Sequence, residues 1–163
     1  MIVSGRAIVI PQANVDTDVL YPGAYLNVTD VEEMTRYLFE GLDPSLRDQL
    51  GGDTILVVGP NFGAGSSREH VPQAMKASGI RALVGDSFAR IFYRNCINLG
   101  LPAFVNAEAA AAARPGSTVE IDTDEGAIAV DGTPFETPAL PAFMQDLLER
   151  GGLEDWVRGQ VAR

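Results

Sequence analysis

Short apolar runs and segments with helical spacing alternate along the first two thirds of the chain. Four continuous runs, each bounded by turn residues, predict buried strands: residues 6–10, 54–59, 81–85 and 102–105. Three segments with apolar residues three or four positions apart predict amphipathic helices: residues 29–41, 71–78 and 87–99. Strands that alternate with helices in this way are typical of an α/β fold.

Capping signals predict where two helices begin. Thr29 and Glu32 fit a capping box at the start of the first helix, and Gly41 suits its C-terminal cap. Directly after Asp43, Pro44 is well placed at the first position of another short helix.

The last third of the chain has a different pattern. Residues 108–113 predict an alanine-rich helical turn. Two alternating segments predict the strands of a hairpin: residues 118–122 and 127–131. Residues 140–150 and 153–161 have helical spacing and are separated by a pair of glycines. The sequence contains no internal repeat and no linker long enough to divide it, so we expect one domain over residues 1–163.

A glycine-rich turn follows the second predicted strand, and residues 59–70 read GPNFGAGSSREH. Its glycines, Gly63 and Gly65 among them, let the backbone come close to a ligand. Peptide N–H groups at the start of the following helix, together with the helix dipole, favour negative charge there. Arg68 can add a planar clamp for a carboxylate or a phosphate. The turn therefore predicts an anion-binding site that contains a candidate nucleophile or base.

The better-known chemistries of glycine turns do not fit these residues. A Walker A loop needs a lysine where Gly65 stands, and a dinucleotide fingerprint needs a small residue where Arg68 stands. A nucleophile elbow needs a glycine two positions after its serine, where Arg68 or Glu69 stands. A Ser-His-acid triad would have to use His70, which is too close in sequence to both serines. Nucleotide binding and serine-hydrolase chemistry are therefore disfavoured.

Four blocks of sequence resemble the small-subunit family of 3-isopropylmalate dehydratases, the swivelling-domain component of the aconitase family. In chain order they are NVDTDVLYP with YLNVTD, NFGAGSSREH, DSFARIFYRN, and GLP at residues 100–102. The resemblance covers most of residues 5–105, and Gly151-Gly152-Leu153 adds a further match. It implies an α/β fold of the three-layer β/β/α type, the swivelling domain of the aconitase family.

Composition narrows the classes of partner. The 163 residues include 22 Asp and Glu against 12 Lys and Arg, and the net charge of −10 disfavours a nucleic-acid backbone as partner. No run of about eighteen apolar residues exists, so no membrane span is expected. The first residues lack the basic and long apolar segments of a secretory signal. We therefore expect a cytoplasmic protein that binds neither nucleic acid nor membrane.

The single cysteine limits the cofactor chemistry of the chain. Cys96 lies in the amphipathic segment 87–99, where we expect it to be a small buried hydrophobe. One thiol can form no disulfide within the chain and cannot hold a four-iron cluster. Because the family resemblance implies a [4Fe-4S] cluster, it also implies that a separate large subunit carries it. The chain itself is expected to bind no metal or cofactor and to supply half of an active site.

Ser66 matches the catalytic serine of the family, which the resemblance implies acts as an alkoxide-like base on a carbon next to a carboxylate. An ordinary serine hydroxyl is a poor base, so N–H groups of the turn and Arg68 would have to stabilise negative charge strongly. Spacing alone favours another interpretation, in which Ser66 caps the following helix and Glu69 completes the capping box. With the resemblance, the catalytic role is favoured.

The neighbours of Ser66 receive roles by the same resemblance. Ser67 and Arg68 are expected to contact a carboxylate of a small dicarboxylate substrate, since an unpaired arginine in a glycine turn has few structural uses. Glu69 and His70 are expected to hold the turn through hydrogen bonds rather than to touch substrate.

Two aspartates lie in the loop over residues 11–24. As a spaced pair, Asp16 and Asp18 could bind a metal, but no third ligand is apparent in the sequence. We expect them to tie the loop to its own backbone or to the partner subunit.

The resemblance assigns substrate specificity to the YLNVTD loop, residues 25–30, which in the family lies over the variable substituent of the malate substrate. Relatives that act on tricarboxylates such as homocitrate have an arginine at the position of Asn27. Because Asn27 is uncharged and Val28 offers apolar surface, an alkyl substituent such as isopropyl is favoured over a third carboxylate. One methylene changes binding by only about 1–3 kcal/mol, so the loop does not sharply separate isopropyl from methyl.

Two positions depart from the family pattern. Ala64 stands where small subunits often have cysteine, a change that we expect to leave catalysis intact. Ala24 stands where many relatives have arginine, which leaves an altered substrate open.

The resemblance as a whole implies a hydro-lyase subunit of leucine biosynthesis. With its large subunit it would interconvert 2-isopropylmalate and 3-isopropylmalate by dehydration and rehydration. Two alternatives stay open: a related hydro-lyase acting on 2,3-dimethylmalate, citramalate or homoaconitate, and a non-catalytic carboxylate-binding module.

Overall fold

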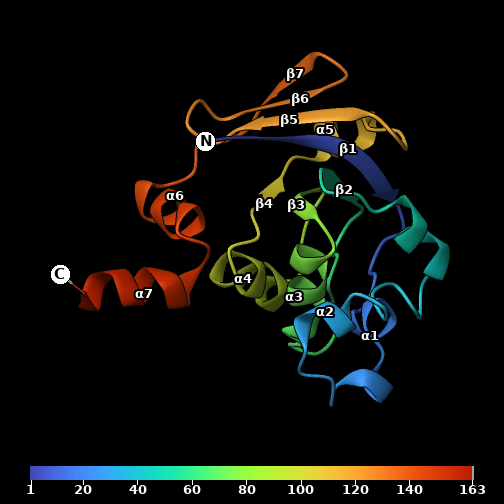
Figure 1. Ribbon diagram of the computed structural model, residues 1–163. Helices are drawn as coiled ribbons and strands as arrows, with labels where there is room; N and C mark the ends of the chain where they lie inside the picture. Colours follow the sequence, from blue (N-terminus) through green and yellow to red (C-terminus); the bar gives the residue numbers. More distant parts are fainter. Residues whose placement is uncertain (163) are drawn as a thin grey trace.

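One mixed sheet of seven strands organises residues 1–162, the part of the chain that the computed structural model describes (Figure 1). The strand order across the sheet is β4-β3-β2-β1-β5-β6-β7. The strands of one half are parallel: β1 (Ile2–Ile10), β2 (Thr54–Val58), β3 (Ile80–Gly85) and β4 (Ala103–Val105). The other half is antiparallel: β5 (Thr118–Asp122), β6 (Ala127–Val130) and β7 (Thr133–Glu136).

Strand β1 belongs to both halves of the sheet. Residues 2–6 pair antiparallel with β5, whereas residues 6–10 pair in parallel with β2, so the strand passes from one half to the other at Arg6. Next to this point, Gly5 has no room for a side chain, because an added Cβ would overlap the carbonyl group of Asp53. The sheet curls about β1, so that β5, β6 and β7 form a layer over the parallel strands (Figure 1).

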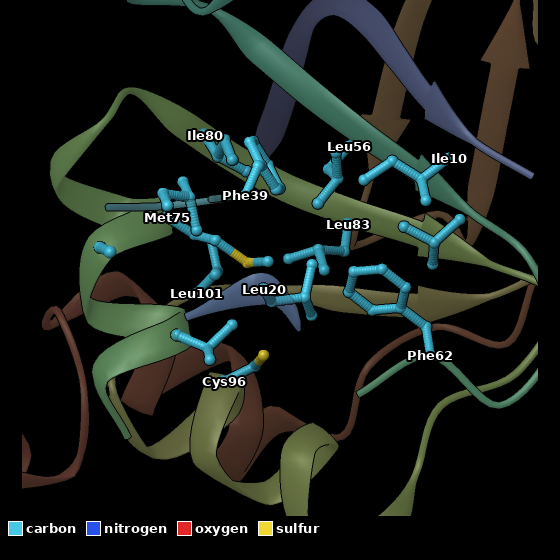
Figure 2. Close-up of a cluster of buried hydrophobic side chains, with 14 of the residues drawn as sticks. Ile10, Leu20, Phe39, Leu56, Phe62, Met75, Ile80, Leu83, Cys96 and Leu101 are labelled. Atoms are coloured by element: carbon cyan, nitrogen blue, oxygen red, sulfur yellow. The ribbon is translucent and has the colours of Figure 1, made fainter. Parts of the chain in front are cut away.

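Two hydrophobic cores lie on opposite faces of the parallel half. Inside the curl, Ile55 and Val57 of β2 belong to the same buried cluster as Ile121 and Ile128 of the antiparallel half. On the other face, Leu56 packs in the cluster that lies between the parallel strands and the helices, much of which Figure 2 shows. Because both faces of β2 are covered, its sequence is a continuous apolar run. Antiparallel strands, parallel strands and helices thus form three layers, which confirms the predicted α/β class and its β/β/α arrangement.

Helices cover the outer face of the parallel half (Figure 1). They are α1 (Thr17–Leu20), α2 (Val31–Met34), α3 (His70–Ala77) and α4 (Arg90–Asn98). The remaining helical elements are η1 (Gly23–Tyr25), η2 (Pro44–Gln49), α5 (Ala107–Ala112), α6 (Ala142–Glu149) and α7 (Leu153–Val161). Within residues 1–162, none of these helices is long and apolar enough to cross a membrane.

The predicted helix over residues 29–41 is wrong in its length and in its cap. Only α2 is α-helical, and its N-cap is Asp30, whose carboxylate accepts a hydrogen bond from the Glu32 N–H at 3.1 Å. Phe39 has a φ of +67°, which ends any helix, and its N–H donates to the Leu20 carbonyl at 2.7 Å. Tertiary pairing with α1 and burial of Phe39 therefore replace the later turns of the predicted helix.

Strand β7 was not predicted. Pro134 weakens the strand pattern, but β7 lies at the edge of the sheet, where a residue without an N–H group is tolerated. The turn before it, Asp131-Gly132, has positive φ at both residues, as a tight hairpin turn requires. The four strands predicted in the first two thirds and the predicted hairpin are all present.

Helix α4 is shorter than predicted and begins at Arg90 rather than near residue 87. Residues 87–89 pair instead with the glycine turn, since the Phe62 N–H donates to the Ser87 carbonyl at 3.1 Å and Phe62 accepts from Ala89 at 2.9 Å. Cys96 is fully buried, as predicted, whereas Ile91 lies on the exposed face of the helix.

The hydrogen bonds to the Asp131 carboxylate predict that the stability of the fold depends on pH. Its carboxylate accepts hydrogen bonds from the Ser117 hydroxyl at 2.8 Å and the Thr118 N–H at 2.9 Å, and these bonds lower its pKa below the ordinary value of 3.8. A lowered pKa stabilises the fold above the ordinary value, and this stabilisation is lost as the pH falls through the lowered one. Asp131→Asn, which tolerates the positive φ, should lower the melting temperature at neutral pH.

The difference from the wild type should shrink as the pH falls through the lowered pKa of Asp131, where the wild-type carboxyl takes up a proton and loses its charge. Thermal unfolding followed by circular dichroism at several pH values measures it. A melting-temperature difference that stays constant across this range would contradict the assignment.

Candidate functional site

The loops that follow β1, β2 and β3 meet at the carboxyl ends of these parallel strands. The loop after β1 pairs with the glycine turn after β2, since the Thr17 N–H donates to the Ala64 carbonyl at 2.8 Å. In the same way the Gly63 N–H donates to the Val15 carbonyl at 2.8 Å. The loop after β3 joins them through the pairing of Phe62 with Ser87 and Ala89. Carboxyl ends of parallel strands are where α/β proteins commonly bind ligands.

Gly63 and Gly65 both have left-handed backbone conformations, with φ values of +84° and +93°. An added Cβ at Gly63 would overlap the ring of Phe92, and at Gly65 it would lie 2.6 Å from a carboxylate oxygen of Asp16. Glycine is therefore needed at both positions for the turn itself, through its backbone conformation and through close packing.

Ser66 and Ser67 are exposed on the turn. The N-cap of α3 is Glu69, which makes no side-chain capping hydrogen bond, so the interpretation of Ser66 and Glu69 as a capping box is wrong. The Ser66 carbonyl accepts from the Arg68 N–H at 2.9 Å, and this tight turn leaves Ser66 outside the helix.

Three consecutive N–H groups of the turn have no acceptor. Within residues 1–162, the N–H groups of Gly65, Ser66 and Ser67 donate no hydrogen bond. Successive free N–H groups in a turn form a concave site of the kind that binds anions, and the N-terminus of α3 adds its dipole. The backbone thus has the donors that the sequence predicted for an anion site.

Thr17 was not among the predicted site residues. It is 1% exposed, its hydroxyl donates to the Ser66 carbonyl at 3.0 Å, and its Oγ1 lies 3.5 Å from the Ser66 Oγ. The signal in the sequence was its place between two aspartates in the first block that carries the family resemblance. Spacing could not reveal the contact, because the two residues are 49 positions apart.

Arg68 is not the unpaired arginine that the sequence suggested. Its Nη2 lies 2.9 Å from a carboxylate oxygen of Asp18, and its Nη1 donates to the Tyr21 carbonyl at 2.9 Å. The guanidinium is held between the turn and α1, with 18% of the side chain exposed. The remaining N–H groups of the guanidinium are free to donate hydrogen bonds to the carboxylate of a ligand.

The two aspartates tie the loop after β1 in place. Asp16 caps α1 by accepting from the Asp18 N–H at 2.7 Å, and Asp18 pairs with Arg68. The expectation that they hold the loop to its own backbone is confirmed for Asp16. Asp18 instead ties the loop to the glycine turn, through its ion pair with Arg68.

His70 and Glu69 differ in what they do. A ring nitrogen of His70 lies 3.2 Å from the Val28 carbonyl, and its ring packs 5.1 Å from that of Tyr21. His70 thus makes a hydrogen bond of the kind that was expected to hold the turn, and its partner lies in the YLNVTD loop. Glu69 is exposed and makes no side-chain hydrogen bond or ion pair within residues 1–162, so its predicted hydrogen-bonding role is wrong here.

The YLNVTD loop is anchored by aromatic side chains. The hydroxyl of Tyr21 donates to the Tyr25 carbonyl at 2.8 Å, and Tyr25 stacks on Tyr37 with ring centroids 3.9 Å apart. Burial raises the pKa of Tyr21, and the nearby Tyr37 and Glu33 raise it further, so this hydroxyl stays a donor. Asn27 is exposed, and Val28 is half-buried and packs against the core between the parallel strands and the helices.

The chain offers no ligand set for an iron-sulfur cluster. Its one thiol, Cys96, is fully buried, and burial raises its pKa well above the ordinary value. Within residues 1–162 no three His, Cys, Asp or Glu side chains gather where they could hold a metal ion. A four-iron cluster, which needs several thiolates, does not fit the residues of this chain.

Comparison with known families supports the sequence resemblance. The model of the aconitase C-terminal domain matches residues 8–106, which contain the end of β1, the strands β2, β3 and β4, the glycine turn and α4. A protein named 3-isopropylmalate dehydratase small subunit from Caldanaerobacter subterraneus is 45% identical over 150 residues, which cover 91% of this chain and 93% of that protein. The 2,3-dimethylmalate dehydratase small subunit of Eubacterium barkeri is 44% identical, with coverage of 88% and 90%.

A solved structure agrees with the family match and with the curated relatives. The crystal structure of 3-isopropylmalate dehydratase from Methanocaldococcus jannaschii superposes with a TM-score of 0.91 at 35% identity. The match covers 99% of this chain and 96% of that one, so the curled sheet and the C-terminal helices are both included.

The packing at Gly63 predicts a large and local cost of substitution. Gly63→Ala should lower the free energy of unfolding by about 2–4 kcal/mol. Strain at its left-handed φ accounts for about 1–2 kcal/mol, and overlap with the Phe92 ring accounts for the rest.

Gly132→Ala is the matched control, because its φ is +85° and nothing lies within 4 Å of an added Cβ. It should lose only the strain contribution. Urea unfolding of both variants measures the difference, and equal losses would show that the Phe92 contact does not limit the turn.

Proposed function

Because the chain belongs to the aconitase C-terminal domain family, among the small subunits of dehydratases, we propose that it supplies half of a hydro-lyase active site. With a large subunit it interconverts 2-isopropylmalate and 3-isopropylmalate by dehydration and rehydration, a reaction of leucine biosynthesis in the cytoplasm. The chain acts in this complex as one swivelling domain.

The exposed hydroxyls on the glycine turn are the observation that carries the proposal. Ser66 and Ser67 stand beside three consecutive N–H groups that have no acceptor within residues 1–162. In a site closed by a partner, these donors would be desolvated, and they would then stabilise negative charge far more strongly than in water. Such stabilisation is what a serine hydroxyl needs to act as a base.

Ser66 removes the proton from the carbon next to a substrate carboxylate, and Ser67 and Arg68 hold that carboxylate. Arg68 is already oriented by Asp18 and Tyr21, so little side-chain freedom is lost when an anion binds. Gly63 and Gly65 form the turn, and His70 fixes it against the loop that carries Asn27 and Val28.

The [4Fe-4S] cluster of this chemistry belongs to the large subunit. The lack of suitable thiolates in this chain, which has one buried cysteine, supports that division. The name "small subunit" of the relatives from Caldanaerobacter subterraneus and Eubacterium barkeri also supports a complex of two different chains.

A second substrate has specific support. The Eubacterium barkeri relative, named for 2,3-dimethylmalate, is about as similar to this chain as the isopropylmalate relatives are. Asn27 and Val28 offer no cation for a third carboxylate. Homoaconitate is therefore disfavoured, and the two candidate substrates that carry alkyl groups are favoured. The two alkylmalates differ in formula by one CH2, and one methylene changes binding by only about 1–3 kcal/mol.

Reconstitution tests the half-site directly. The ultraviolet absorbance of the alkenoate intermediate is followed with 3-isopropylmalate and, separately, with 2,3-dimethylmalate. Each substrate is given to this chain alone, to a cluster-loaded large subunit alone, and to the mixture. We expect turnover in the mixture only. Turnover of 2,3-dimethylmalate but not of 3-isopropylmalate by the mixture would select the second substrate. Silence with both substrates, with the cluster intact, would overturn the hydro-lyase assignment.

Ser66→Ala should lower kcat of the mixture by about 10²–10⁴-fold, because the general base is lost. Its melting temperature and its assembly with the large subunit should not change, since the side chain is exposed. Ser4→Ala, an exposed serine on β1, is the control for surface substitution and should keep wild-type turnover. Wild-type kcat in Ser66→Ala would exclude Ser66 as the base.

A further inference from the structure

Four serine or threonine residues are buried within residues 1–162, and one of them, Thr17, faces the glycine turn. Three of the buried polar residues serve structure at a distance from the turn: Thr54, Ser117 and Thr123. Thr54, for example, bonds to Gly51 at the start of its own strand. Thr17 differs, because the partner of its hydroxyl is Ser66.

The position of Thr17 is fixed from several directions. Its N–H donates to the Ala64 carbonyl at 2.8 Å, and its carbonyl accepts from the Tyr21 N–H at 2.9 Å. Its branched side chain has few rotamers in a helix, and it is 1% exposed. The hydroxyl is therefore presented to Ser66 by a rigid backbone and a restricted side chain.

The hydroxyl of Thr17 reaches both the backbone and the side chain of Ser66. It donates its hydrogen to the Ser66 carbonyl at 3.0 Å, and its oxygen lies 3.5 Å from the Ser66 Oγ. With its hydrogen on the carbonyl, Thr17 has lone pairs for the hydroxyl hydrogen of Ser66. If the Ser66 oxygen carries negative charge, rotation about the Cβ–Oγ bond of Thr17 turns the hydrogen toward it.

We propose that Thr17 is a positioning residue of the active site, which orients the Ser66 hydroxyl and supports it when it acts as the base. The inference rests on the proposed function, because it gives Thr17 a role only through Ser66. No proton moves between the two residues; the Thr17 hydrogen changes its acceptor. Thr17 would therefore affect the chemical step and leave substrate binding to Ser67 and Arg68.

Two substitutions separate the hydroxyl from the shape of the side chain. Thr17→Val keeps the branched shape and removes the hydroxyl, and the Ser66 carbonyl still accepts from the Arg68 N–H. We expect kcat to fall about 10- to 100-fold, the effect of one hydrogen bond to a charged group, while KM stays within about twofold. Thr17→Ser keeps the hydroxyl and should restore kcat to within about threefold of the wild type.

Thr54→Val is the matched control. It removes another buried threonine hydroxyl, one that bonds to Gly51 rather than to the turn. It should lower the melting temperature without changing kcat. If Thr54→Val lowered kcat as much as Thr17→Val, or if Thr17→Ser were as slow as Thr17→Val, the hydroxyl of Thr17 would have no specific role.

The double variant shows whether Thr17 acts through Ser66. Thr17→Val combined with Ser66→Ala should be no slower than Ser66→Ala alone, because the hydroxyl has nothing left to position. If Thr17→Val slowed Ser66→Ala by the same factor as it slows the wild type, Thr17 would act independently of Ser66 and the proposal would fall.

A measurement that does not depend on turnover separates the positioning role of Thr17 from the proposed function. The ¹⁵N resonance of the Ser67 amide, which shares its peptide group with the Ser66 carbonyl, should shift in Thr17→Val of the full chain and return in Thr17→Ser. If the wild-type complex turns over neither alkylmalate, the proposed function fails while this resonance still reports the contact. An unchanged resonance in Thr17→Val would overturn the contact itself and, with it, the positioning role.

Discussion

The parallel pairing of β1 with β2 is the constraint on which the candidate site depends. It continues past the ends of both strands, where Thr17 pairs with Ala64 and Val15 with Gly63. This extension places the loop after β1 directly beside the glycine turn. The hydroxyl of Thr17 and the carboxylate of Asp18 thereby meet Ser66 and Arg68 across about fifty residues of sequence.

One side of the glycine turn is anchored to the rest of the chain, and the other side is exposed. On the anchored side, Arg68 is held by Asp18 and Tyr21, and His70 contacts the Val28 carbonyl. On its exposed side, the turn presents both serine hydroxyls, and its three free N–H groups have no acceptor within the described chain. Because water weakens electrostatic interactions, such donors act strongly on an anion only when another surface excludes water from them. The geometry therefore favours a site that is completed by a partner.

Local sequence signals predicted the fold where burial follows directly from apolar pattern. The continuous run of β2 needs cover on both faces, and the curled sheet with its helices gives it that cover. Prediction failed where tertiary contacts changed the local preference. Phe39 leaves the helical path because its N–H pairs with Leu20 and its ring enters the core, and Pro134 is accepted in β7 because that strand is at an edge.

The site divides in the same way. The sequence by itself determined the glycine turn and the chemical types of the residues at 66–68, because these follow from neighbouring residues, whereas the left-handed conformations of Gly63 and Gly65 were found in the structure. It could not determine that Ser66 lies outside the helix cap or that Arg68 is already paired. Thr17 as the neighbour of Ser66 also came only from the tertiary structure. Such contacts depend on the register between β1 and β2, and register is set by the packing of whole strands rather than by any local run of residues.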